Sequence, residues 1–210
     1  MTRFDAEREE MIELLRERSI TDERLLQVMG TIERHLFVPE PFTNRSYDDS
    51  ALPIAKGQTI SQPYTVALMT QALRVTDGAK VLEVGTGSGY QACILAAMGA
   101  RTFTIERDMD LLAGARKLFD RLGCRIASKC GDGTVGWNEF APFDGIIVTA
   151  GAPDVPEPLR KQLADGGRLV IPVGDLDLQT LVVITRHGEK FDRQEISGFK
   201  FVPLIGKMGW

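Results

Sequence analysis

The sequence predicts a doubly wound α/β fold, and three observations support this prediction. From residue 63 onward, short apolar runs rich in β-branched residues alternate with amphipathic stretches of helical period. The apolar runs are continuous, which is typical of parallel strands that are covered on both faces. Strands and helices succeed one another at the spacing of right-handed βαβ units. We therefore expect one mostly parallel sheet between layers of helices.

Two amphipathic helices are expected before the sheet begins. The first spans residues 4–18 and carries its apolar side chains on one side, among Glu and Arg. The second takes Thr21 as its N-cap and continues to about His35, with Pro39 beyond it. Acidic residues match basic ones in this region, so we expect a lid or an edge layer instead of a DNA-reading pair.

The sheet and its helices follow in chain order. Residues 42–62 are polar, contain Pro53 and Gly57, and are expected to form a loop with little regular structure. Beyond this loop the patterns predict helices over residues 63–74, 89–98, 108–122 and 156–164. They predict buried strands over residues 80–84, 101–106, 124–130, 143–149 and 167–173. The last strands, expected to be antiparallel and to close one edge of the sheet, are 180–186 and 191–202, joined at His187–Gly188.

Composition limits the possible functions. A chain of 210 residues suits one domain with an appendage and can bury a substantial core. The net charge of −4 and the pI of about 5.3 argue against avid binding to a phosphate backbone. Cys93, Cys124 and Cys130 lack the paired spacing of a zinc site, so we expect free thiols and no metal. No apolar run resembles a signal peptide or a membrane span, so we expect a cytoplasmic protein.

The sharpest motif is a glycine-rich turn within Val81–Tyr90, which reads VLEVGTGSGY. A buried strand runs into glycines and a helix follows, and open α/β sheets bind ligands at such points. The dinucleotide fingerprint G-x-G-x-x-G/A requires a small residue where this chain has Tyr90, and the third glycine is Gly89 instead. The pattern acid-x-G-x-G-x-G, with Glu83 as the acid, resembles the first motif of class I S-adenosylmethionine-dependent methyltransferases. A purely structural strand–helix turn is the alternative.

Two more acidic residues lie at the ends of predicted strands. Glu106 ends its strand, where a carboxylate can accept hydrogen bonds from both ribose hydroxyls. Asp132 follows the next strand, and in the class I family an acid at this place binds the adenine amino group. Taken singly, each is more often a loop acid or a helix cap; together with Glu83 they indicate one cofactor crevice. The cofactor-binding residues that this resemblance implies are Glu83, Gly85, Thr86, Gly87, Gly89, Tyr90, Glu106, Arg107, Asp132 and Gly133.

Other segments narrow the resemblance to one family. The stretch Gly57–Tyr64, GQTISQPY, is very similar to the signature of bacterial protein-L-isoaspartate O-methyltransferases. The resemblance covers about Thr21 to Trp210, and its other matching segments are 47–49 (YDD), 131–133 (GDG), 146–150 (IIVTA), 167–174 (GRLVIPVG), 201–206 (FVPLIG) and 209–210 (GW). The family often has Gly-His where this chain has Ala55-Lys56. This departure concerns the electrostatics of the acceptor mouth and leaves the cofactor site unaffected.

The resemblance implies a protein repair reaction in a Rossmann-like class I methyltransferase fold. The enzyme would move a methyl group from S-adenosyl-L-methionine to the free α-carboxylate of L-isoaspartyl residues in damaged proteins and peptides. A carboxylate is already ionised at neutral pH, so no general base is needed. Catalysis would come mainly from in-line alignment of oxygen, methyl and sulfur, in a dry site where opposite charges are annihilated.

The same resemblance suggests how the single domain over residues 1–210 is organised. Residues 1–62 would supply N-terminal helices and a substrate-side loop, 63–174 the cofactor-binding α/β core, and 175–210 the C-terminal strands. We expect a monomer whose partners are isoaspartyl-containing proteins and peptides, and which binds neither nucleic acid nor membrane. The resemblance also implies that the last two strands of the sheet are reordered relative to other class I enzymes.

The acceptor site is expected around the GQTISQPY stretch. The family's active-site serine corresponds to Ser61, and the implied substrate-binding residues are Thr59, Ile60, Ser61, Tyr64, Val202, Pro203 and Leu204. Short hydroxyls can orient a carboxylate without neutralising it, whereas a tight Arg pair would weaken the nucleophile. Ser61 is an equally good N-cap for the helix that begins near Pro63, and the two roles can coexist. An ordinary half-buried aromatic is the alternative for Tyr64.

Other functions are less consistent with the residues. A hydrolase elbow requires G-x-S-x-G, and Ser88 lacks glycine at both outer positions. The chain has only two histidines, His35 and His187, in places that do not suit a catalytic triad. An NAD-dependent oxidoreductase is disfavoured by Tyr90.

Rivals within the superfamily remain open. We find neither the Asn-Pro-Pro-Tyr-type segment nor the Pro-Cys nucleophile expected of nucleic-acid methyltransferases. A class I enzyme acting on another carboxylate or on a small molecule is a further alternative. A non-catalytic S-adenosylmethionine-binding module is the alternative from another class, and the intact Ser61, Glu106 and Asp132 argue against it.

Overall fold

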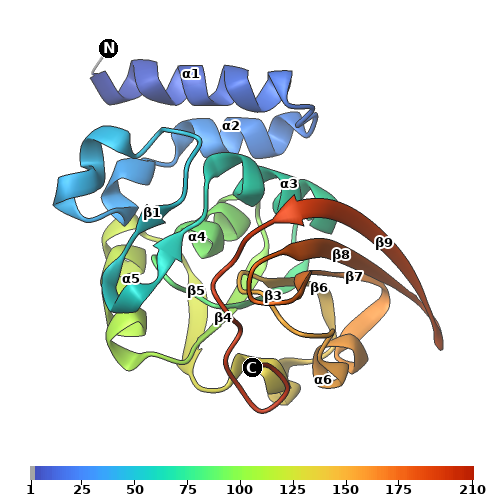
Figure 1. Ribbon diagram of the computed structural model, residues 1–210. Helices are drawn as coiled ribbons and strands as arrows, with labels where there is room; N and C mark the ends of the chain where they lie inside the picture. The colour runs from blue at the N-terminus through green and yellow to red at the C-terminus, as the bar shows by residue number, and fades with distance from the viewer. Residues whose placement is uncertain (1–2) are drawn as a thin grey trace.

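A seven-stranded sheet forms the centre of the molecule (Figure 1). The computed structural model describes residues 3–210 except for the side chain of Ser197, so the first two residues of the predicted 1–62 segment lie outside the described part. The strands lie in the order β5-β4-β3-β6-β7-β8-β9, and neighbours from β5 to β7 are parallel. Strands β8 and β9 add an antiparallel edge. The predicted mostly parallel sheet with an antiparallel edge is confirmed.

The strands coincide closely with the apolar runs. Their bounds are β3 Lys80–Val84, β4 Arg101–Glu106, β5 Ile126–Cys130, β6 Phe143–Val148, β7 Leu163–Gly174, β8 Gln179–His187 and β9 Lys190–Phe199. Alternate residues of a strand point to opposite faces. In β3, Val81 accordingly packs into one core, whereas Leu82 and Val84 pack into the other. Two hydrophobic cores therefore lie on the two faces of one sheet.

Helices cover both faces. One core includes residues of α3 (Pro63–Leu73), α4 (Tyr90–Ala97) and α5 (Met109–Leu122). The other contains α6 (Glu157–Lys161) and lies near the short 3₁₀ turns η4 (Gly133–Val135) and η5 (Asn138–Phe140). Because each helix follows a parallel strand, the carboxyl ends of the strands and the first turns of α4 and α5 meet at one edge, where the site lies.

The N-terminal helices form an outer layer. Helix α1 (Arg3–Glu17) packs on α2 (Glu23–Thr31) and α3, and α2 packs on α3 and α4. Figure 1 shows α1 and α2 stacked outside the sheet-covering helices. Neither lines the pocket described below. Of the two expected arrangements, a lid or an edge layer, their packing on α3 and α4 matches an edge layer.

The second helix differs from its prediction at both ends. Asp22 is the N-cap, and its side chain accepts a hydrogen bond from the Leu25 N–H at 3.0 Å. Thr21 instead donates its N–H to the side-chain oxygen of Gln71 in α3, at 2.7 Å. The helix ends at Thr31 because Ile32 is extended, and the separate 3₁₀ turn η1 (Arg34–Phe37) contains His35.

Smaller differences concern the loop and the late strands. Residues 42–62 are irregular as expected, but they include the end of a 3₁₀ turn η2 (Glu40–Arg45), a further turn η3 (Ala55–Gly57) and a ribbon of β1 (Leu52–Pro53) with β2 (Thr59–Ile60). Helix α6 stops at Lys161, short of the predicted residue 164, because Leu163 already pairs with Phe143 in the sheet. Strand β9 ends at Phe199, and 200–202 leave the sheet.

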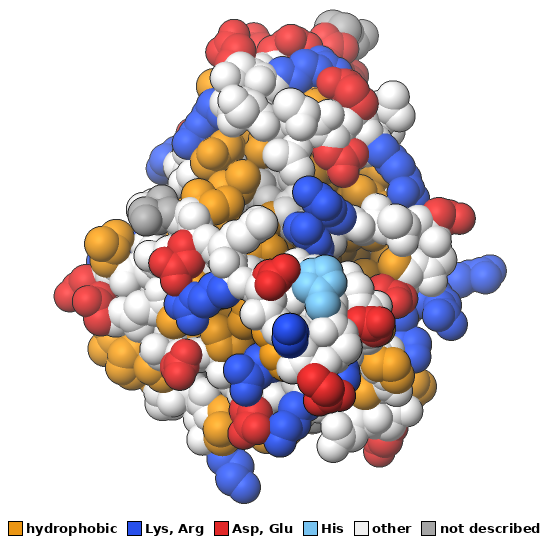
Figure 2. Space-filling model, turned by 90° about the vertical axis from the view of Figure 1, so that its right-hand side faces the viewer, with side chains coloured by type: hydrophobic (Ala, Val, Ile, Leu, Met, Phe, Trp, Pro, Cys, Tyr) orange, Lys and Arg blue, Asp and Glu red, His pale blue; other side chains and the backbone are white. Residues whose placement is uncertain are grey.

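Within residues 3–210, no helix combines the length and the apolar character needed to cross a bilayer. On the face shown in Figure 2, acidic and basic side chains are interspersed, and neither sign gathers into a continuous patch.

Candidate active site

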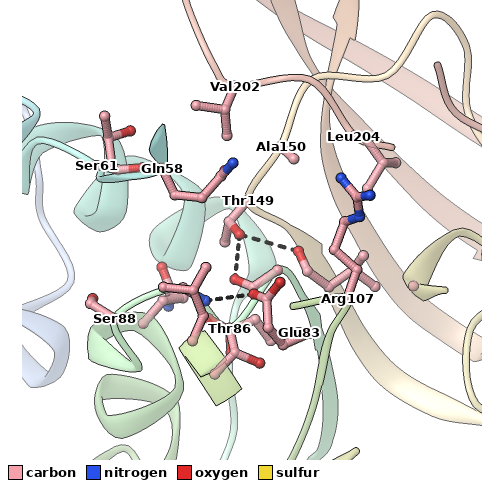
Figure 3. Close-up of a pocket in the computed structure, with 18 of the residues that line it drawn as sticks. Gln58, Ser61, Glu83, Thr86, Ser88, Arg107, Thr149, Ala150, Val202 and Leu204 are labelled. Carbon is pink, nitrogen blue, oxygen red and sulfur yellow. Dashed lines mark hydrogen bonds between the residues drawn. The ribbon is translucent and has the colours of Figure 1, made fainter. Parts of the chain in front are cut away.

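A pocket opens at the carboxyl ends of β3, β4 and β6 (Figure 3). Its floor is the glycine turn that joins β3 to α4, and the ends of β3 and β4 form one side. The loop before α3 and the segment after β9 form the other sides. The predicted site residues that line it are Thr59, Ile60, Ser61, Glu83, Gly85, Thr86, Gly87, Tyr90, Glu106, Arg107, Gly133, Val202, Pro203 and Leu204. The predicted residues Tyr64, Gly89 and Asp132 do not line it.

The glycine turn requires its glycines. Gly85, Gly87 and Gly89 have φ of 98°, 51° and 88°, a region that side chains with a Cβ disfavour. A Cβ on Gly85 would lie 2.5 Å from Oγ1 of Thr149, and one on Gly89 would lie 2.6 Å from the ring of Phe119. Gly89 therefore serves the packing of α4 against α5, whereas Gly85 and Gly87 let the backbone line the pocket.

Glu83 is a buried carboxyl group with one unsatisfied oxygen. Its Oε2 accepts a hydrogen bond from the Thr104 hydroxyl at 2.5 Å, and that hydroxyl also contacts the hydroxyl of Thr86 at 2.6 Å. Its Oε1 is buried and has no partner among the described residues. Burial raises the pKa of Glu83 to about 8, with a small contribution from the charge of Glu106, although the Thr104 hydrogen bond opposes the shift. A buried polar oxygen without a partner is a candidate contact for a donor group on a ligand.

Glu106 organises the backbone around the pocket. Its Oε2 accepts a hydrogen bond from the Gly87 N–H at 2.9 Å, and its Oε1 accepts one from the Asp108 N–H at 3.0 Å. Each carboxylate oxygen retains a further lone pair, so the group can still accept hydroxyl donors. The Glu106 side chain thus links the glycine turn to the start of α5.

Asp132 ties down the C-terminal segment. Its Oδ1 accepts hydrogen bonds from the N–H and the hydroxyl of Thr134, at 2.9 and 2.7 Å, and its Oδ2 accepts one from the Lys207 N–H at 2.8 Å. Burial acts to raise the pKa of Asp132, but these hydrogen bonds outweigh it and the pKa is lowered. The bond from the Thr134 N–H makes Asp132 the N-cap of η4, which is the capping role weighed for it above, whereas the sequence did not indicate the bond from Lys207.

The hydroxyl of Ser61 does not cap α3. The N-cap is Gln62, which makes no side-chain capping bond, and Asp49 accepts the hydrogen bond from the Tyr64 N–H at 2.9 Å. Among the described residues, the Ser61 hydroxyl has no hydrogen-bond partner. The guanidinium carbon of Arg18 lies over the Tyr64 ring, 3.5 Å from the ring centroid. This contact explains why the Tyr64 side chain is not part of the pocket wall.

The segment after β9 is held as a short parallel bridge. The Gly151 N–H donates to the Val202 carbonyl at 2.8 Å, and the Leu204 N–H donates to the Gly151 carbonyl at 2.7 Å. The indole of Trp210 donates to that same Gly151 carbonyl at 3.1 Å, and the Trp210 N–H donates to the Leu204 carbonyl at 2.9 Å. The pocket wall formed by Val202–Leu204 is therefore fixed from both sides.

Several lining residues were not predicted. They include Gln58, Ser88, Thr149 and Ala150, which Figure 3 labels around the pocket, and also Lys56, Val66, Met69, Val84, Gln91, Ile105, Asp108, Leu111 and Ile205. The Thr149 hydroxyl lies 2.7 Å from the Gly85 carbonyl and 3.1 Å from the Val84 carbonyl, which links β6 to the glycine turn. Its position at the end of the predicted strand 143–149 was the available signal.

Lys56 bridges the pocket mouth. It has φ of 61°, and its Nζ lies 2.6 Å from Oδ2 of Asp110 in the first turn of α5. The ion pair, first through its hydrogen bond and then through its charge, raises the pKa of Lys56. Lys56, at the position where the chain departs from the family pattern, is thus ion-paired with α5.

Known proteins are similar to this chain over almost its whole length. The family model described as protein-L-isoaspartate(D-aspartate) O-methyltransferase matches residues 6–209. A protein-L-isoaspartate O-methyltransferase of Chlorobium luteolum is 54% identical over 99% of this chain and 94% of its own length. One of Geobacter metallireducens is 51% identical over 99% and 97%.

Solved structures agree with the sequence comparisons. A protein-L-isoaspartate O-methyltransferase is 27% identical with a TM-score of 0.87, covering 96% of this chain and 67% of that one. A putative Plasmodium falciparum protein of the same description, in complex with S-adenosyl-L-homocysteine, is 26% identical with a TM-score of 0.82, covering 94% and 98%. With a family match over nearly its whole length and relatives about half identical to it, the chain belongs to the protein-L-isoaspartate(D-aspartate) O-methyltransferase family.

Proposed function

We propose that this chain transfers a methyl group from S-adenosyl-L-methionine to the free α-carboxylate of L-isoaspartyl residues in damaged proteins and peptides. One observation carries the proposal. Residues 58–61 of the GQTISQPY stretch and Val202–Leu204 line the same pocket as the glycine turn and the strand-end acids Glu83 and Glu106. The proposed cofactor site and the proposed acceptor site therefore share one pocket.

The cofactor half fits S-adenosylmethionine by its donor set. The unpartnered Oε1 of Glu83 is placed to accept a hydrogen bond from an ammonium group, and Glu106 retains lone pairs for the ribose hydroxyls. The positive-φ glycines expose backbone to the ligand. The cofactor supplies an electrophilic methyl group that already carries its leaving group. For Asp132 we retain the adenine contact as a proposal, next to its bonds to Thr134 and Lys207.

The acceptor half orients a carboxylate without neutralising it. The Ser61 hydroxyl has no partner among the described residues and can donate to the acceptor oxygen, and Gln58 lines the same wall. Lys56 is ion-paired with Asp110, so a carboxylate already balances its positive charge at the pocket mouth. Since the nucleophile needs no base, the chain contributes alignment and exclusion of water.

We further propose that the protein acts as a monomer in the cytoplasm, without nucleic-acid or membrane partners. The net charge of −4 and the mixed charges on the face shown in Figure 2 support the absence of nucleic acid. Size-exclusion chromatography with light scattering tests the monomer, and a dimer mass would overturn it.

A methyl-transfer assay with matched peptides tests the function. Two peptides of one sequence would contain isoaspartate or aspartate at one position, and labelled methyl incorporation would be followed for each. We expect transfer only to the isoaspartyl peptide. Equal transfer to both would refute repair specificity, and transfer to neither, with cofactor still bound, would refute the acceptor assignment.

A further inference from the structure

A buried arginine lies directly behind the acceptor wall. Arg34, in η1, is fully shielded from solvent although the pocket is close by. Its Nε donates to the Ser46 carbonyl at 2.7 Å, and its Nη2 donates to the Ser61 carbonyl at 2.8 Å. Its guanidinium carbon lies 4.8 Å from the ring centroid of Tyr90. The third nitrogen, Nη1, has no partner among the described residues.

No carboxylate forms an ion pair with this guanidinium within residues 3–210. The nearby Asp49 uses its two oxygens for the Tyr64 N–H and for Arg18. Burial accordingly lowers the pKa of Arg34, against the opposing influence of Tyr90 and Asp49. A buried cation held only by carbonyl dipoles and an aromatic face is costly for stability. General packing therefore does not explain its presence well.

The contacts of Arg34 join the two halves of the pocket. Ser61 lies between β2 and α3 on the acceptor side, and Tyr90 begins α4 directly after the glycine turn. Both residues line the pocket. The edge of the Tyr90 ring also packs against Phe37, at 5.3 Å between centroids, on the same 3₁₀ turn as Arg34. The main chain at Ser61 is thus fastened to the cofactor side through one side chain.

We propose that Arg34 is a positioning residue for methyl transfer, which acts through the main chain of Ser61 and holds the acceptor carboxylate in line with the methyl group. The inference rests on the function proposed above. Arg34 does not line the pocket, so we expect it to contact neither reactant. Its guanidinium reaches two carbonyls at once because its donors form a rigid fork, which a lysine cannot reproduce. In-line displacement is sensitive to small misplacements of the nucleophile, so turnover should depend on this fork.

Two substitutions separate positioning from stability. Arg34→Met removes the donors, and Arg34→Lys keeps the charge with a single nitrogen. We expect kcat for the isoaspartyl peptide to fall about 100-fold in Arg34→Met and only about tenfold in Arg34→Lys. The affinity for S-adenosylhomocysteine, measured by calorimetry, should change less than about threefold, since the lost bonds lie on the acceptor side.

Arg168→Met is the matched control. Arg168 is a partly buried arginine that also donates to a carbonyl, that of Ala72 at 2.9 Å, and it does not line the pocket. We expect this variant to lower the melting temperature and to leave kcat near that of the parent protein. An equal loss of kcat in both methionine variants would reduce Arg34 to a structural role and overturn the proposal.

Amide hydrogen exchange gives a readout that does not need turnover. Each protein would be measured at the same number of degrees below its own melting temperature. The amides of residues 58–64 should then exchange faster in Arg34→Met than in the parent protein, and at the parent rate in Arg168→Met. Unchanged exchange there, or kcat in Arg34→Met within about threefold of the parent, would overturn the proposal. If the parent protein transfers no methyl group, the proposed function fails, and the exchange result still decides the role of Arg34.

Discussion

The two halves of the pocket are built in different ways. On the cofactor side, Glu83 and Glu106 lie at the ends of neighbouring strands whose register is fixed by the sheet, and Glu106 accepts a hydrogen bond from the glycine turn. On the acceptor side, the residues lie outside the main sheet and are held by individual side-chain hydrogen bonds. Arg34 binds the Ser61 carbonyl, and Gln179 accepts from the Phe201 N–H at 2.7 Å. The cofactor-side residues are thus positioned by strand pairing, whereas the acceptor-side residues are positioned by a few side-chain hydrogen bonds that single substitutions can remove.

The largest expected effect concerns Glu83, whose burial belongs to the sheet. Its pKa is about 8 in the folded protein against an ordinary value of 4.5. Between these values the folded protein holds a proton that the unfolded chain releases, so the free energy of unfolding falls as pH rises through this window. Relative to Glu83→Gln, the parent should lose roughly 3 kcal/mol between about pH 5 and pH 8. Urea unfolding of the ligand-free proteins measures it, and parallel pH curves for both proteins would contradict the assignment.

Glu106→Ala tests the other strand end. The substitution removes the acceptor of the Gly87 and Asp108 N–H groups together with the proposed ribose contacts. We expect cofactor affinity to fall about 100-fold, equivalent to about 2.7 kcal/mol. Calorimetry with S-adenosylhomocysteine measures the change. Glu195→Ala, on the exposed strand β9, is the control. An unaltered affinity in Glu106→Ala would show that Glu106 does not contact the cofactor.

Gly85→Ala tests the turn itself. A Cβ there meets Thr149 at 2.5 Å, in addition to the strain of a φ of 98°. Such strain costs about 1–3 kcal/mol, so cofactor affinity should fall about tenfold or more. Gly123→Ala has a comparable φ of 68° with nothing within 4 Å of its Cβ, and should reduce stability without changing affinity. Equal affinity losses in both variants would show that the effect is not local to the pocket.

A smaller effect distinguishes Asp49 from Ser61 on the acceptor side. Asp49→Ala removes the acceptor of the Tyr64 N–H at the start of α3 and should reduce the free energy of unfolding by about 1 kcal/mol. Ser61→Ala should reduce turnover with little change in stability or in cofactor affinity. Thermal unfolding and steady-state kinetics on both variants provide the comparison. Destabilisation by Ser61→Ala with unchanged turnover would restore its capping role.

The smallest effect is expected at Lys56. Its ion pair with Asp110 is solvent-exposed, and Lys56→Gly would also relieve the positive φ. The free energy of unfolding should change by less than about 0.5 kcal/mol. Cofactor affinity should be unaffected as well. A tenfold rise in KM for the peptide would place Lys56 in contact with the acceptor instead.

Sequence patterns predicted the parts of the molecule that are set locally. The strands, the glycine turn and the acids at strand ends are each fixed by runs of a few residues, so their positions agree with the structure. Helix ends were less accurate: Asp22, not Thr21, is the N-cap of α2, and the main-chain N–H groups of both residues donate to the side chain of Gln71 in α3. Leu163 joined the sheet although its segment has a helical pattern.

Most of the acceptor wall could not be predicted in this way. The capping of α3 by Asp49 and the link from Asp132 to Lys207 join residues that no local pattern relates. Tyr64 belongs to a conspicuous motif, yet Arg18 covers its ring and keeps it off the wall. Motif similarity indicates which residues belong together, but the partner that each one takes is decided by tertiary contacts.

The position of Trp210 provides the protein with an optical reporter. The chain has two tryptophans, and Trp137 is buried against Phe103 and Phe140. Trp210 is about 42% exposed, and its indole is bonded to the carbonyl that anchors the pocket wall. Changes in emission wavelength when a peptide is added will therefore arise at Trp210, and stopped-flow fluorescence can follow acceptor binding in the unlabelled protein.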